Sequence, residues 1–134
     1  MSLQPSQTVS TYVTKMLGKR NVGTTALNVG QCVGLVECWL QATGSAAIPG
    51  NACDLLTNAA AQGRKTLTNG PTNYPLPGDI VCWGKTWGNG YGHCAVVVAA
   101  NSMWLAVLEQ DDPYGAGCVV ATHDYTGVSG WIVL

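Results

Sequence analysis

Charge is scarce in this chain of 134 residues. Only 10% of the residues are charged, and the formal net charge at pH 7 is −1. Surfaces that bind nucleic acid, or that hold anionic membranes electrostatically, depend on clustered lysine and arginine. The composition therefore excludes nucleic acid and a charged membrane surface as expected partners.

Long apolar segments are also missing. No run approaches the roughly 20 residues of a membrane-spanning helix, and the N-terminus lacks the apolar core of a signal peptide. We therefore expect no membrane partner, no signal peptide and no export route of the chain's own.

Closely spaced cysteine pairs are absent too. Six cysteines and two histidines are present, but no Cys-x-x-Cys pair, which disfavours a structural zinc site. A domain of this size does not need disulfides, and free cysteines in apolar patterns behave as core residues. We predict no metal, no cofactor and six free thiols, at Cys32, Cys38, Cys53, Cys82, Cys94 and Cys118.

The elements that the sequence does contain come in two blocks. Apolar spacing and capping residues predict helices over 8–17, 32–43 and 51–61. After residue 63 the chain turns to short β-rich runs separated by glycine, proline and asparagine, at 65–67, 79–84, 93–99, 103–110, 118–125 and 131–134. Short connections imply antiparallel neighbours. The expected fold is α+β, with N-terminal helices packed on an antiparallel sheet of about six strands, in a single domain over 1–134.

The stretch 28–40 places Cys32 at the first turn of an apolar helix that follows a glycine-containing loop. The partial positive charge and unpaired N–H groups of a helix N-terminus lower a cysteine pKa and can hold an oxyanion. Cys32 is therefore a candidate nucleophile. The alternative is a buried cysteine that serves as a small hydrophobe.

Candidate partners for Cys32 lie at two predicted strand ends. His93 begins an apolar strand after the glycine-rich loop 88–92, and Glu109 ends another apolar strand. A nucleophile, a histidine base and a group that orients the base form the thiol-protease arrangement. The alternatives are a structural histidine and a solvated strand end. We interpret His123 as structural or surface, because no comparable loop or carboxylate strand is predicted beside it.

Four short motifs carry a resemblance to a known family: Gly30-Gln31-Cys32-Val33, Pro77-Gly78-Asp79-Ile80-Val81-Cys82-Trp83, Gly92-His93-Cys94-Ala95-Val96-Val97 and Val107-Leu108-Glu109-Gln110-Asp111. In this order and spacing the chain resembles the CHAP family, cysteine- and histidine-dependent amidohydrolases and peptidases with a papain-like core that cut bacterial peptidoglycan. The resemblance implies that Cys32 attacks a carbonyl, His93 transfers protons and Glu109 orients His93. It also implies that Gln31 and the Cys32 backbone N–H hold the oxyanion, although Gln31 could instead cap the helix.

Two features depart from that family. Many relatives carry asparagine where this chain has Asp111, which can accept a hydrogen bond but cannot donate one as an amide does; we keep it as a reserve orienter. Many relatives bind calcium through aspartates in the approach to the cysteine, whereas 19–27 contains no carboxylate here. Because calcium needs several oxygen ligands, we expect no calcium site there.

Aromatic residues near the predicted site are candidates for binding substrate. Trp83, Trp87 and Tyr91 could line a peptide or sugar groove, as could Trp104. Their alternative role is core packing.

Together these features predict a hydrolase that cleaves amide bonds of peptidoglycan, as an N-acetylmuramoyl-L-alanine amidase or an endopeptidase, by a Cys-His-Glu mechanism. Its partner would be the bacterial cell wall, reached from the host cytoplasm through a holin or from a phage virion. We expect a monomer in isolation that could belong to a larger lysin or virion assembly. The alternatives are a non-catalytic wall-binding or phage structural module, and an acyltransferase or deamidase on the same core.

The pairing of the two central strands can also be predicted. Residues directly opposed in an antiparallel pair share a face of the sheet. If His93 opposes Glu109, the connecting loop is 100–102, and one face carries His93, Ala95, Val97, Ala99, Met103, Leu105, Val107 and Glu109. This register would bring Glu109 within hydrogen-bond reach of the His93 ring.

Overall fold

The computed structural model describes residues 5–134. Its helices are α1 (Pro5–Met16), α2 (Cys32–Ala42) and α3 (Leu55–Ala61), with short 3₁₀ turns η1 (Ala52–Asp54) and η2 (Gly88–Gly90). The strands are β1 (Thr66–Leu67), β2 (Ile80–Trp83), β3 (His93–Ala100), β4 (Leu105–Glu109), β5 (Val119–His123) and β6 (Val128–Ile132). They form one antiparallel sheet in the order β1-β6-β2-β3-β4-β5. The predicted α+β fold with about six antiparallel strands is confirmed.

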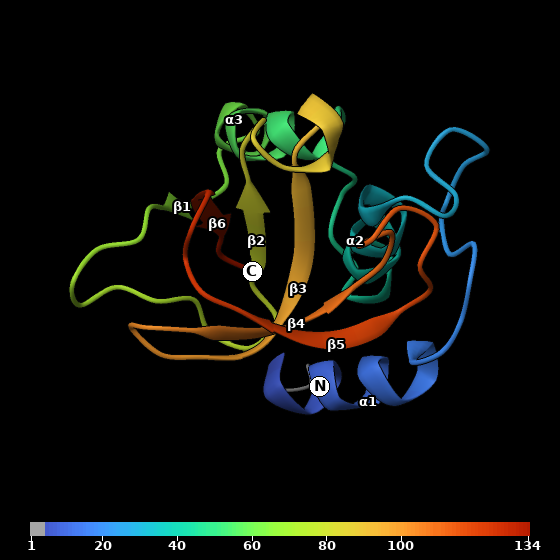
Figure 1. Ribbon diagram of the computed structural model, residues 1–134, viewed down its shortest axis with the longest axis horizontal. Helices are drawn as coiled ribbons and strands as arrows, with labels where there is room; N and C mark the ends of the chain where they lie inside the picture. The colour runs from blue at the N-terminus through green and yellow to red at the C-terminus, as the bar shows by residue number, and fades with distance from the viewer. Residues whose placement is uncertain (1–4) are drawn as a thin grey trace.

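Helix α2 occupies the centre of the larger core cluster, as its apolar sequence predicts. It lies alongside β3 (Figure 1), and Leu35, Val36 and Leu40 have no exposed surface. The Tyr12 hydroxyl of α1 donates to the Leu35 carbonyl at 2.8 Å, which fixes α1 against α2. Since α2 is held along its length, the position of its first residue is fixed as well.

A second core cluster lies on the other face of the central strands. It contains Val81, Trp83, Ala95, Val97, Leu105, Val107 and Trp131. Every residue of β2 is buried, so this strand is covered on both faces. None of the described helices has the length and apolar character that a bilayer crossing requires.

The predicted register of β3 and β4 is wrong. Val97 opposes Val107 and Val96 opposes Leu108. Extended by one residue, this alignment puts Glu109 opposite Ala95 instead of opposite His93. A bulge between Val97 and Ala99 then shifts the pairing. The connecting loop is 101–104, one residue longer than predicted, and is closed by the Asn101 side-chain oxygen, which accepts two backbone N–H groups.

The face prediction survives this shift for most residues. The observed offset from the predicted register is two residues before the bulge, and an even offset leaves each side chain on the same face. Ala95, Val97, Leu105 and Val107 therefore share one cluster as predicted. Ala99 and Met103 do not: the bulge brings Ala100 opposite Leu105, and Met103 lies in the loop with 76% of its surface exposed.

Candidate active site

Cys32 is the first residue of α2, and the preceding loop fixes its place. Gln31 is the extended N-cap residue, and the Gly30 N–H donates to the Val22 carbonyl at 2.9 Å. A Cβ atom at Gly34 would collide with the carbonyl oxygens of Val22 and Asn28. Glycine at this position therefore lets the first turn of α2 pack directly on the loop. Cys32 as a residue remains partly exposed.

Gln110 ties this loop to the end of β4, a role that the sequence analysis missed. It is 1% exposed. Its Oε1 accepts the Val22 N–H at 2.9 Å, and its Nε2 donates to the carbonyls of Val22 at 3.0 Å and Gln31 at 2.7 Å. One buried amide therefore holds the residue before Cys32 in place from the strand that carries Glu109. Its position next to Glu109 was the only signal in the sequence.

The structure brings His93 and Glu109 together. Nε2 of His93 lies 2.7 Å from Oε2 of Glu109, and the two residues are 3% and 1% exposed. Because an ionised carboxylate only accepts hydrogen bonds, the proton of this bond belongs to Nε2. Nδ1 is then the ring nitrogen left for Cys32, which is close enough to His93 for each residue to shift the pKa of the other.

The electrostatics of these groups favour an ion pair. A hydrogen bond with the Cys94 thiol, helped by the hydrogen bond and charge of His93, outweighs burial and lowers the pKa of Cys32 to about 5. Burial lowers the pKa of His93, but the hydrogen bonds and charges of Cys32 and Glu109 prevail and raise it to about 9. At neutral pH the pair therefore favours thiolate and imidazolium.

His123 also reaches Glu109, which corrects the interpretation of this residue. Strand β5 pairs with β4, so a carboxylate strand does lie beside His123. Its Nε2 is 2.8 Å from Oε1 and 3.2 Å from Oε2 of Glu109. Burial raises the pKa of Glu109, yet the two histidines outweigh it and keep that pKa below its usual value. The order of the strands in the sheet could not be predicted from local pattern, so this neighbour was not predicted.

The aromatic residues divide into core and surface. Trp83 opposes His93 in the β2 and β3 pairing, with ring centroids 5.1 Å apart, and has no exposed surface. Its predicted role in substrate binding is therefore wrong, because its side chain is part of the core. Trp87 is half-buried and stacks on both Trp83 and His93. Tyr91, two residues before His93, is 63% exposed.

A family model described as the CHAP domain matches residues 22–111, a span that contains Cys32, His93 and Glu109. The chain belongs to the CHAP family. It is 35% identical over 95 residues to endolysin PlyTW of Staphylococcus phage Twort. This alignment covers 62% of this chain and 20% of that protein. The chain thus spans about a fifth of the length of this curated relative.

Two solved structures share the fold. The endolysin LysIME-EF1 aligns with a TM-score of 0.77 and 20% identity, over 98% of this chain and 64% of its own. Ly7917, solved with the hydrolysing product of MDP, aligns with a TM-score of 0.72 and 23% identity, over 96% of this chain and 62% of its own. The CHAP fold expected from the four motifs is confirmed.

Two further positions of this CHAP domain are arranged differently from the prediction. The Gln31 side chain donates to the Leu27 carbonyl at 3.0 Å and makes no cap hydrogen bond to α2. The Asp111 carboxylate accepts the Gly115 N–H at 2.6 Å, in a loop. It is Asp112 that approaches the site: its carboxylate and one ligand atom each of His93 and Glu109 lie within 4.8 Å of one another, a spacing that could hold a metal ion.

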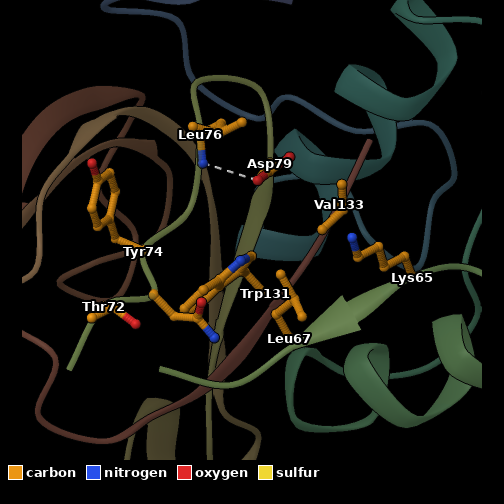
Figure 2. A pocket seen from close by; sticks show the side chains of 9 residues that line it. Lys65, Leu67, Thr72, Tyr74, Leu76, Asp79, Trp131 and Val133 are labelled. Carbon is orange, nitrogen blue, oxygen red and sulfur yellow. Dashed lines mark hydrogen bonds between the residues drawn. The ribbon is translucent and has the colours of Figure 1, made fainter. Parts of the chain in front are cut away.

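The CHAP domain also has a hollow of about 300 Å³ beside β1 and β6, shown in Figure 2. Trp131, Leu67, Tyr74 and Leu76 contribute to its lining. The Asp79 carboxylate accepts the Leu76 N–H there at 2.9 Å. None of the predicted site residues lines this hollow, so it is separate from the Cys32 site.

Proposed function

We propose that this chain is the catalytic domain of a peptidoglycan hydrolase that cleaves amide bonds of the bacterial cell wall by a Cys-His-Glu mechanism. One observation carries the proposal: a partly exposed cysteine whose thiol has a lowered pKa begins a helix beside a histidine, and a buried carboxylate holds the far nitrogen of that histidine. Those are the parts that nucleophilic acyl transfer requires.

In the proposed reaction the Cys32 thiolate attacks the carbonyl carbon of the scissile amide. The Cys32 backbone N–H stabilises the oxyanion; the Gln31 amide can contribute if it leaves the Leu27 carbonyl. His93 gives its proton to the leaving amine, which departs as the acyl-thioester forms. His93 then takes a proton from water, and the hydroxide attack releases the acid and restores the thiol pair.

The cell wall as substrate is supported by the relatives. PlyTW and LysIME-EF1 are endolysins by name, and Ly7917 was solved with a hydrolysis product. We extend this activity to the present chain as part of the proposal, together with action during phage lysis. Whether the bond is that of an amidase or of an endopeptidase is a question for product analysis.

The alternative of a non-catalytic wall-binding module fits the site less well. A buried carboxylate and imidazole cost free energy to desolvate, and a buried ion pair is often no more stabilising than an apolar pair of the same volume. A module that only binds would not need the pair, nor a thiol of lowered pKa next to it.

Digestion of purified walls tests the proposal. The chain should release soluble fragments with new amino groups, and Cys32→Ala should release none. Mass spectrometry then assigns the bond: an amidase frees stem peptides that begin with the first alanine, whereas an endopeptidase leaves shortened peptides on the sugar. Binding to walls without release by the native chain would favour the non-catalytic module.

A further inference from the structure

The Glu109 carboxylate lies between two imidazoles, and the mechanism above uses only one of them. Oε2 accepts from Nε2 of His93 at 2.7 Å, and Oε1 accepts from Nε2 of His123 at 2.8 Å. We propose that His123 is a positioning residue: by holding one oxygen of Glu109, it keeps the other oxygen on His93 and so maintains the Cys32 and His93 pair. The effect of His123 on catalysis rests on the proposed hydrolase function. Its effect on the Cys32 and His93 pair does not depend on that function.

The first support is the burial of Glu109 and the shortage of other donors. Glu109 is 1% exposed. Within residues 5–134 its carboxylate has hydrogen bonds to the two histidines alone. If His123 were removed, Oε1 would be a buried acceptor without a partner, which strongly disfavours the ionised form. Glu109 would then bind a proton more readily or rotate to find another donor, and either change weakens its bond to His93.

The second support is how the His123 ring is held. Its ring is T-shaped to those of Trp83 and Trp87, with centroids 5.2 Å and 5.4 Å away and interplanar angles of 68° and 73°. The same two indoles contact the His93 ring at 5.1 and 5.7 Å. The two tryptophans thus pack against both imidazoles that bond to Glu109. A ring fixed in this way loses little further freedom when it donates to the carboxylate.

The charged and titratable groups around the Glu109 carboxylate determine how loss of His123 would change the pH dependence of the Cys32 and His93 pair. His93 approaches Glu109 from β3, His123 from β5, and Asp112 from the loop after β4. Asp124 follows His123 on the surface, and Cys32 faces His93 from α2. Loss of the His123 donor weakens Glu109 as a partner of the imidazolium. The thiolate and imidazolium are then both less stable. The pH range over which the ion pair forms should therefore narrow at its acidic and at its alkaline limit.

Alkylation of Cys32 by iodoacetamide measures the acidic limit of this range, where the thiolate forms, without any wall substrate. The rate would be followed from pH 4 to pH 10 in the full chain, with the Cys32 peptide quantified by mass spectrometry. In His123→Leu we expect the acidic midpoint to rise by about one pH unit and wall digestion to slow roughly 10-fold, the loss typical of one hydrogen bond to a charged group. His123→Gln places an amide N–H near the position of Nε2, and should restore both within about twofold.

Two further variants make the result interpretable. Glu109→Gln should raise the acidic midpoint of alkylation at least as much as His123→Leu does. His123→Asn, whose amide is too short to reach Glu109, should behave like His123→Leu while keeping a polar residue at this position, and it replaces the leucine variant if that one does not fold.

The proposal is overturned if the donor-free variants, folded by circular dichroism, give the native alkylation profile. It is equally overturned if His123→Gln shifts the profile as far as His123→Leu, since the ring would then matter for packing alone. Failure of the hydrolase proposal looks different: the native chain would digest no wall while the alkylation profiles still shifted as expected.

Discussion

Nε2 of His93 donates to Oε2 of Glu109 at 2.7 Å across two side chains that are almost completely buried. This bond keeps a proton on Nε2 in both protonation states of the ring, and so leaves Nδ1 as the nitrogen that can exchange a proton with Cys32. The burial of both groups keeps bulk water from competing for the bond. The expected behaviour of the protein follows largely from this pair and the thiol beside it.

Wall digestion should be fastest between about pH 5 and pH 9. The active form needs Cys32 deprotonated, which holds above its pKa of about 5, and His93 protonated, which holds below its pKa of about 9. The rate should therefore rise through the first value and fall through the second. Initial rates measured across pH 4 to 10 test this. A single rise near pH 8.5, the value of an ordinary thiol, would contradict the ion pair.

Gln110→Leu should destabilise the protein by roughly 2–4 kcal/mol, because three hydrogen bonds to the loop backbone disappear and the buried Val22 N–H loses its partner. Urea denaturation measures the change. The matched control is Gln41→Leu on the exposed side of α2, which should stay within about 0.5 kcal/mol of the native chain. Equal effects of the two substitutions would show that the buried amide does not hold the loop.

The sequence predicted those parts of the site that depend on local pattern. Cys32 begins its helix, and His93 and Glu109 end up on one face, because helix starts and the alternation along a strand are properties of short segments. The roles of these residues in catalysis stay a prediction.

What the sequence did not predict depends on contacts between distant segments. The bulge in β3 altered the register, the order of strands brought His123 to Glu109, and the fit of Gln110 against residue 22 arises only once β4 and the loop are packed. Trp83 was misassigned for the same reason, since local sequence does not distinguish a tryptophan that lines a substrate groove from one that is buried in the core.

All six thiols should react in an unfolded, unreduced sample. Each cysteine is unpaired in the structure, and Cys82, Cys94 and Cys118 are buried. Titration of freshly purified protein with a thiol reagent in denaturant should give six groups per chain. A count of four would reveal a disulfide and contradict the prediction.

Calcium should not be required for activity. The approach to Cys32 at 19–27 has no carboxylate to offer a hard cation. A chelator should therefore leave the rate of wall digestion unchanged within error. Loss of activity that added calcium restores would point to a site elsewhere, with Asp112 the first residue to examine, since it approaches His93 and Glu109.

The central claim is that Cys32 is the nucleophile, and wall digestion by Cys32→Ser tests it most directly. The serine hydroxyl is not appreciably ionised by His93, so release of soluble fragments should fall by roughly a thousandfold or more, and His93→Ala should lose as much because the members act as a unit. Both variants should keep the circular dichroism spectrum of the native chain. A folded Cys32→Ser protein that still digested walls at the native rate would contradict the mechanism.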